Sequence, residues 1–144
     1  MYKSVLVATD GSATASEAVR AAIELAQVFG ATLHIASVYN TADTSAMAWS
    51  GMTIPYVEGE DPGGDAAAHT EAMAAGARSK GISVETHVMP GYVVEQILGV
   101  AVKQKVELIV VGNKGMKGLK RVLGSVPNAI AHSAPCAVLI VNTT

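Results

Sequence analysis

Five short runs of apolar, mostly β-branched residues recur along the chain, and segments with a helix-like pattern lie between them. The runs are Ser4–Ala8, Thr32–Val38, Ile82–Val88, Leu108–Val111 and Ala137–Val141. Runs of this length and composition predict strands. Their alternation with helices is typical of a parallel sheet that is covered by helices on both faces. The pattern therefore predicts a doubly wound α/β domain.

The first helix has the most complete sequence signals. Thr14 and Glu17 form a capping-box pattern at its start, and Gly30 can supply a left-handed stop at its end. An apolar stripe repeats at helical spacing between these signals. We expect this helix to run from Ala15 to Phe29.

Two further helices are expected between later strands. An alanine-rich stretch predicts one from Ala66 to Ser79, ending before Gly81. The other is indicated by four apolar residues at helical spacing, namely Val94, Ile97, Leu98 and Ala101. Both are expected to pack against the sheet.

The segment from Asn40 to Gly64 shows neither period and is rich in glycine and proline, which predicts a long loop. Its large side chains include Met47, Trp49, Met52 and Tyr56. Long loops within compact domains are often functional. These side chains either attach the loop to the domain or cover a ligand or a partner.

Composition narrows the class of protein. The chain has 144 residues, 50% of them hydrophobic, which is enough for one core, so residues 1–144 are interpreted as one domain. A net charge of −2 and 4% aromatic residues argue against a nucleic-acid partner. Cys136 is the lone cysteine, no signal-peptide pattern is present, and no apolar run reaches the ~20 residues that span a bilayer. We expect a cytoplasmic protein without membrane insertion.

The stretch VVGNKGMKGLKRVLGSVP, residues 110–127, is the strongest candidate for chemistry. A strand ends in a glycine-rich turn that leads into a helix. Glycines let backbone N–H groups approach a phosphate, and a helix N-terminus adds oriented donors. Four cations in the turn would offset phosphate charge, namely Lys114, Lys117, Lys120 and Arg121. This stretch is therefore a candidate phosphate site.

Glycines after a strand also occur at ordinary turns, which leaves a second interpretation open. Ser125, followed by Val126 and Pro127, is equally a plain helix start with serine as the N-cap. The stretch lacks the Gly-Lys-Ser/Thr end of a P-loop and follows the fourth strand, not the first. Spacing alone does not decide between the two interpretations.

Asp10 is a second candidate, because the first strand delivers it to the carboxyl edge of the sheet. Ligands of doubly wound domains bind at that edge. Its carboxylate could bond a ribose hydroxyl or a nucleobase, or help to hold a metal. Alternatively, Asp10 forms an Asx-type turn with Gly11 that caps the first helix.

Other reactive side chains give weaker signals. The four histidines, His34, His69, His87 and His132, fall on different predicted elements without ligand spacing, so no zinc site is predicted. Cys136 is interpreted as a small apolar filler. No nucleophile elbow or general-base pairing is found, so no catalytic residue is predicted.

Three segments together resemble the universal stress protein family, and the resemblance covers essentially the whole chain. They are VLVATDGS at residues 5–12, VVGNKGMKGLKRVLGSV at 110–126 and APCAVLIV at 134–141. Nucleotide-binding members of that family carry G-x2-G-x9-G-S/T after the fourth strand. Gly112, Gly115, Gly124 and Ser125 match its fixed positions, but eight residues, 116–123, separate the second and third glycines, one fewer than in the pattern.

The resemblance implies a five-stranded parallel sheet in the order 3-2-1-4-5 that binds ATP or another adenine nucleotide, with Mg²⁺ or Mn²⁺ as a candidate companion of the phosphates. Asp10 would lie near the ribose or adenine, and the backbone of Val38 would read the adenine edge. The other implied contacts are Ala8 and Thr9 in the pocket wall, Val111 and Gly112 beside the ribose, and Gly115, Gly124, Ser125 and Val126 at the phosphates.

The family also implies a homodimer that forms by pairing of the last strand, Ala137–Val141. The hypothesis that follows is a nucleotide-binding regulatory protein of the stress response, acting through its dimer or a regulated protein partner. One alternative is a slow ATPase or nucleotidyl-transfer enzyme. Another is a module that prefers AMP or cyclic AMP, or needs no nucleotide, because the glycine loop is one residue short.

Overall fold

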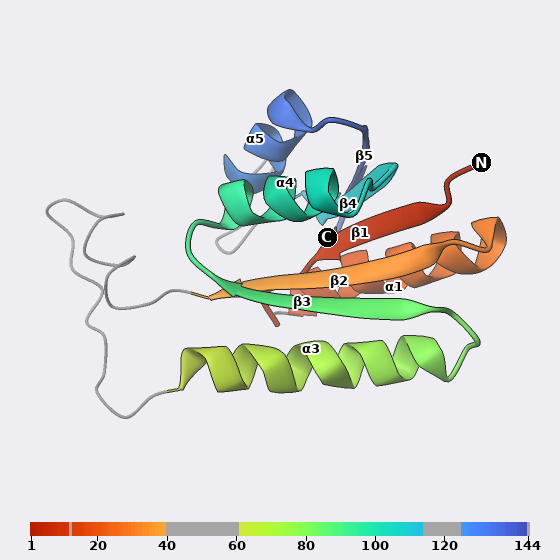
Figure 1. Ribbon diagram of the computed structural model, residues 1–144, viewed down its shortest axis with the longest axis horizontal. Coiled ribbons are helices and arrows are strands. Elements are labelled where there is room, and N and C mark those ends of the chain that lie inside the picture. The colour runs from red at the N-terminus through yellow and green to blue at the C-terminus, as the bar shows by residue number, and fades with distance from the viewer. Residues whose placement is uncertain (12, 40–60, 114–124, 144) are drawn as a thin grey trace, which may run out of the picture.

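The computed structural model describes residues 1–11, 13–39, 61–113 and 125–143, and the predicted strands all lie among them (Figure 1). Their bounds are β1 Ser4–Ala8, β2 Thr32–Tyr39, β3 Val84–Pro90, β4 Leu108–Gly112 and β5 Ala137–Val141. They form one parallel sheet in the order β3-β2-β1-β4-β5. The predicted topology is confirmed.

Helices cover both faces of this sheet, as expected for a doubly wound domain (Figure 1). Their bounds are α1 Ala13–Phe29, α3 Pro62–Arg78, α4 Val93–Lys103 and α5 Ser125–Ser133. The helices α1 and α3 pack on one face, and α4 and α5 pack on the other. Within the described ranges, the helices are all too short or too polar to cross a lipid bilayer.

The core consists of two apolar layers because side chains alternate between the two faces of each strand. Val5 and Val7 point into the layer under α1 and α3, whereas Leu6 points into the layer under α4 and α5. The central strands β1 and β4 are therefore buried on both sides, which explains why their sequences are continuously apolar.

Helix α1 begins at Ala13, two residues before the predicted start. Thr14 therefore lies within the first turn and is not the N-cap, so the capping-box prediction is wrong. The carboxylate of Glu17 instead contacts the guanidinium of Arg20, one turn further along the helix. The end of the helix agrees with the sequence, since Gly30 has a φ of +63°.

Helix α3 begins at Pro62, so residues 62–64, which were predicted to be loop, form its first turn. The Asp61 side chain accepts a hydrogen bond from the backbone N–H of Gly64 at 3.0 Å and caps the helix. Proline fits at the first helical position because the helix does not need its N–H. The rest of the predicted loop, residues 40–60, lies outside the described residues, and so do its large side chains.

Strand β3 begins at Val84 and ends at Pro90, two residues later than predicted at each end. Ile82 is apolar because it is buried in the core, yet pairing with β2 starts only at Val84, opposite Leu33. Pro90 can end the strand because β3 is at the sheet edge, where a missing N–H is tolerated.

Candidate functional site

The carboxyl edge between β1 and β4 is the point where the chain switches direction across the sheet. The two strands are neighbours, with Val5 paired to Leu108 and Val7 paired to Val110. The chain leaves β1 toward β2 on one side and leaves β4 toward β5 on the other. The loops that follow β1 and β4 therefore diverge, and such divergence creates the usual ligand crevice of doubly wound sheets.

The turn after β1 brings Thr9, Asp10 and Gly11 to this edge, with Ala8 as the last strand residue. Thr9 is only 5% exposed, and its N–H donates a hydrogen bond to the carbonyl of Ala36 at 2.9 Å. Its hydroxyl oxygen accepts the N–H of Gly11 at 3.1 Å. The exposed Asp10 lies between these two residues. A hydroxyl role for Thr9 in this turn was not apparent from the sequence.

The end of β2 contributes a polar contact that sequence reasoning missed. Ser37 is 2% exposed, and its hydroxyl oxygen lies 3.5 Å from Nε2 of His69 on α3. A β-carbon on Gly11 would lie 3.1 Å from the same imidazole, so His69 sits against the turn after β1. Ser37 follows the apolar residues Ile35 and Ala36 in the strand, which was a signal for it, but nothing local pointed to His69.

Val38, next to Ser37, is half-buried and packs against the layer on the opposite face of the sheet, under α4 and α5. Val38 is the second-last residue of β2, so its backbone lies at the carboxyl end of the strand. This position is compatible with the backbone role that the resemblance implies for Val38.

The end of β4 leads into the glycine-rich stretch. Val111 is 3% exposed, and Gly112 is the last strand residue, paired with Val141 of β5. The N–H of Asn113 extends this pairing by donating to the carbonyl of Val141 at 2.9 Å. Gly115 and Gly124 belong to residues 114–124, which lie outside the described residues.

The chain is described again from Ser125, which is the first residue of α5 and is exposed. Val126 is half-buried against the core layer on that face, and Pro127 is buried in the first turn. The first backbone N–H groups of a helix have no partner within the helix, so this end can donate to an anion. Gly112 and Ser125 thus mark where the described chain enters and leaves the predicted phosphate loop.

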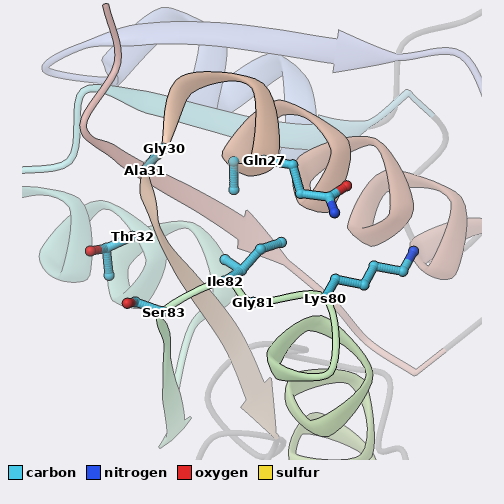
Figure 2. Close-up of a pocket in the computed structure, with 9 residues that line it drawn as sticks. Gln27, Gly30, Ala31, Thr32, Lys80, Gly81, Ile82 and Ser83 are labelled. Atoms are coloured by element: carbon cyan, nitrogen blue, oxygen red, sulfur yellow. The ribbon is translucent and has the colours of Figure 1, made fainter.

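A cavity of about 330 Å³ lies at the opposite, amino edge of the sheet (Figure 2). Its walls are the end of α1, the start of β2 and the turn before β3, with Gln27 and Lys80 among the polar side chains. None of the predicted site residues lines this cavity. It is therefore separate from the candidate site at the carboxyl edge.

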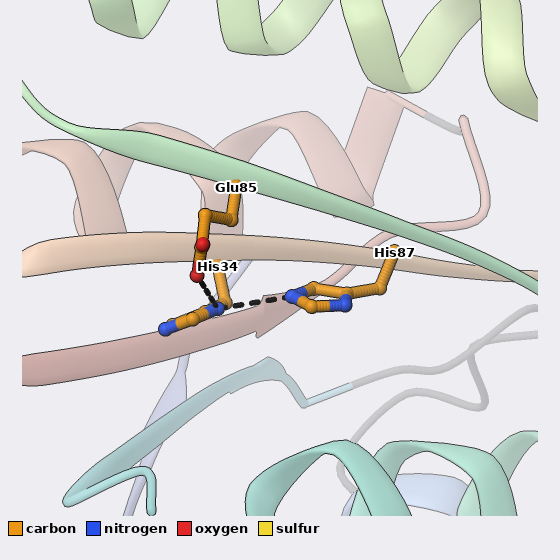
Figure 3. Close-up of side chains that lie close together, drawn as sticks. All are labelled: His34, Glu85 and His87. Atoms are coloured by element: carbon orange, nitrogen blue, oxygen red, sulfur yellow. Dashed lines mark hydrogen bonds and ion pairs between the residues drawn. The ribbon is translucent and has the colours of Figure 1, made fainter. Parts of the chain in front are cut away.

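Two histidines that are far apart in the sequence meet on neighbouring strands (Figure 3). Nδ1 of His34 on β2 lies 3.0 Å from Nε2 of His87 on β3 and 3.3 Å from a carboxylate oxygen of Glu85. Burial lowers the pKa of His34, and the neighbouring His87 lowers it further. Burial also lowers the pKa of His87, which Glu85 opposes. Burial therefore favours the neutral form of both imidazoles.

The doubly wound sheet, with its divergent loops at β1 and β4, defines a class of α/β proteins that bind ligands at the carboxyl edge. The model of the Universal stress protein family matches residues 1–142. The chain therefore belongs to the universal stress protein family, as its sequence motifs indicated.

Individual relatives agree with this assignment. The chain is 35% identical to universal stress protein Rv1636 of Mycobacterium tuberculosis over 146 residues, covering 99% of this chain and 98% of the relative. A universal stress protein whose crystal structure is in complex with cAMP is 28% identical, with a TM-score of 0.73 and 99% of both chains covered. The Archaeoglobus fulgidus universal stress protein in complex with dAMP, 22% identical with a TM-score of 0.66 over 96% of this chain and 97% of its own, shares the fold.

Proposed function

We propose that this protein binds an adenine nucleotide at the carboxyl edge between β1 and β4 and acts as a regulatory protein in the stress response. The observation that carries the proposal is the switch point itself, where the turn at Thr9–Gly11 and the chain leaving Gly112 diverge. Family membership and the relative in complex with cAMP support the choice of ligand. We assign residues 1–144 to one such domain.

The described residues fit the nucleoside half of such a ligand. Gly112 carries no side chain where β4 ends, so a sugar can approach the backbone closely. Asp10 is exposed in the turn that follows the neighbouring strand β1, where its carboxylate could bond a ribose hydroxyl or a metal ion that accompanies the phosphates. The remaining wall is assigned to Ala8, Thr9, Val38 and Val111.

The phosphate half is assigned to the glycine stretch and the helix that follows it. Gly115, Gly124, Ser125 and Val126 would supply backbone N–H groups, and the Ser125 hydroxyl would add one more donor. The exposed start of α5 suits this role because a helix N-terminus favours negative charge. When bound, Mg²⁺ or Mn²⁺ would offset phosphate charge.

ATP is the first candidate ligand, because four positions match the family's ATP-binding pattern. Cyclic AMP is the second, because the loop is one residue short and a relative with 28% identity binds cAMP in its crystal structure. A single cyclised phosphate needs a smaller cradle than a triphosphate chain. The number of phosphates that bind therefore depends on the loop.

The discriminating experiment is to release and identify by mass spectrometry the small molecule that copurifies with the untagged protein. Calorimetric titrations with ATP plus magnesium, AMP and cyclic AMP then rank the candidates. We expect one adenine nucleotide per chain that remains intact on incubation, which separates binding from the alternative of slow ATP hydrolysis. Failure of all three nucleotides to bind would contradict the proposal.

We further propose that two copies associate through β5 and that nucleotide occupancy alters this dimer or its contact with a regulated protein partner. Strand β5 is at the sheet edge, and its Leu139 and Ile140 are 39% and 37% exposed. An apolar edge strand with free backbone groups is prone to pair with another strand. Pairing of the β5 strands of two copies would give the edge backbone N–H and C=O groups of both copies hydrogen-bond partners.

A further inference from the structure

We propose that His34, Glu85 and His87 form a binding site for a divalent first-row transition metal ion such as Zn²⁺, separate from the nucleotide site. Among the residues that the structure describes, these three offer ligand atoms that all lie within 4.8 Å of one another. Imidazole and carboxylate groups are ordinary ligands of such ions. Figure 3 shows the three side chains converging on one point from two adjacent strands.

The spacing of the donor atoms already suits a metal ion. Zinc binds imidazole nitrogen at about 2.0–2.1 Å with tetrahedral geometry, so neighbouring ligand atoms are about 3.3 Å apart. The two distances from Nδ1 of His34, 3.0 Å to His87 and 3.3 Å to Glu85, are close to that value.

Strand register holds the three residues together. His34 on β2 is directly paired with Glu85 on β3, and Ala36 is paired with His87. Residues two apart on a strand share a face, so Glu85 and His87 both lie on the face of His34. Ligands on two hydrogen-bonded strands are positioned more accurately than ligands on loops.

The cluster has one buried ligand and one solvent-exposed ligand, so an ion could be held firmly and still enter from solvent. His34 is 3% exposed and anchors the cluster in the interior, whereas the side chain of Glu85 is 59% exposed and gives an ion a path from solvent. Three protein ligands leave a fourth position for water.

One neighbouring charge opposes cation binding. Lys103, at the end of α4, is close enough to His87 for its positive charge to act on the imidazole. Lys103 is exposed, so its long side chain can turn toward solvent when an ion enters.

The site lies away from the nucleotide-binding edge. His34 precedes Val38 by four residues, or about 13 Å along the strand at ~3.3 Å per residue. An ion here would connect the edge strand β3 to its neighbour β2. We therefore expect the metal to stabilise the sheet edge without competing with ATP.

A simpler role for the cluster is to satisfy the buried ring of His34, since a buried polar group needs a hydrogen-bond partner. The two roles differ in one measurable property, which is metal binding by the folded protein. Untagged, chelator-treated protein would be titrated with Zn²⁺ by calorimetry. Co²⁺ would be used as a spectroscopic probe whose visible absorption reports coordination.

The matched variants are His87→Gln, Glu85→Gln and, as the control, His132→Gln on the exposed surface of α5. We expect one Zn²⁺ per chain, a higher melting temperature with Zn²⁺, and at least about tenfold weaker binding in His87→Gln, since even indirect ligand support is worth 10–100-fold. The control should bind as the wild type does.

Glu85→Gln keeps the proposal testable if His87→Gln fails to fold, because Glu85 is exposed and its replacement should not disturb the core. It should also weaken Zn²⁺ binding and alter the Co²⁺ spectrum. The proposal is overturned if the folded wild type does not bind Zn²⁺ at micromolar concentration, or if folded His87→Gln or Glu85→Gln binds it as tightly as the wild type.

Discussion

The side-chain oxygen of Asn113 accepts two hydrogen bonds from Thr143, one from its backbone N–H and one from its hydroxyl, both at 3.0 Å. This pair ties the first residue after β4 to the segment after β5. Asn113 is the second residue of the predicted phosphate motif, directly after Gly112, so these bonds fix the start of that motif to the chain that follows β5.

Replacement of Asn113 by alanine should lower the free energy of unfolding by about 1–2 kcal/mol, because two partly buried hydrogen bonds are lost. The matched change Thr143→Val removes only the hydroxyl bond and should cost about half as much. Urea denaturation of both variants provides the measurement. Equal losses in the two variants would contradict the two-bond arrangement.

Gly11 has a φ of +82°, which disfavours any residue with a β-carbon. A β-carbon there would also crowd the ring of His69. Gly11→Ala should lower the free energy of unfolding by about 1–2 kcal/mol from the left-handed backbone alone. Gly99→Ala is the control: it lies within α4 with no atom in the path of a new β-carbon, so it should stabilise by about 0.5–1 kcal/mol. In thermal melts, Gly11→Ala should lower the melting temperature and Gly99→Ala should raise it. A shift of the same sign in both variants would refute this account.

The phosphate loop is tested first by Gly115→Val. A β-carbon at this position would penalise a positive φ and separate the backbone N–H groups from an incoming phosphate. We expect weaker ATP binding in calorimetric titrations with magnesium, while thermal melts show a folded protein. An unchanged affinity in the folded variant would remove the glycine stretch from the binding site.

Ser125→Ala completes the same series, because Ser125 is the first residue of α5. If its hydroxyl binds phosphate, affinity should fall a few-fold to about tenfold, which corresponds to about 0.5–1.5 kcal/mol. If it only stabilises the start of the helix, the variant should lose about 1 kcal/mol of stability and keep its affinity. The paired titration and melt therefore separate ligand binding from capping.

The dimer prediction concerns the exposed edge at β5. Leu139→Glu should convert the expected dimer into a monomer, because it places a charge in the centre of the paired edges. Val102→Glu serves as the control, since Val102 is 66% exposed on α4, away from β5. Light scattering at micromolar concentration measures the mass, and a monomeric wild type would exclude this interface.

The lone thiol provides a pH-dependent prediction. Burial raises the pKa of Cys136 above its ordinary value, while a backbone hydrogen bond at Ile109 opposes the shift. Only the thiolate reacts with iodoacetamide, so a raised pKa moves the rise of the alkylation rate to higher pH. The midpoint of the rate profile should be higher in the folded protein than in urea. A midpoint that is equal or lower when folded would be inconsistent with burial of the thiol.

Local sequence patterns predicted the five strands, helix α1 and the family, although several of the element boundaries differ in the structure. Ser4–Ala8 and Ala137–Val141 were predicted to the residue because burial on both faces, or at an apolar edge, leaves a continuous run of apolar side chains. The pattern misplaced β3 by two residues because Ile82 is buried without being paired. Periodicity reports which residues are buried, but not which of them form ladder hydrogen bonds.

The sequence also predicted which candidate site residues lie at the carboxyl edge of the sheet. Thr9 and Asp10 follow β1, and Gly112 is the last residue of β4, so the pairing of these two strands brings all three to one edge. Gly115 and Gly124 lie outside the described residues, and their role remains a prediction from the motif.

Only the tertiary structure decided which distant polar side chains meet. His34 and His87 are 53 residues apart and gave no ligand spacing, yet the pairing of β2 with β3 places their ring nitrogens 3.0 Å apart. His69 reaches the turn at Gly11 only because α3 packs across β2 and β3. The physical reason is that strand register and helix packing are set by the sum of many contacts across the sheet. A short stretch of sequence contains only one of the two residues in each such contact, so it does not show which distant residues meet.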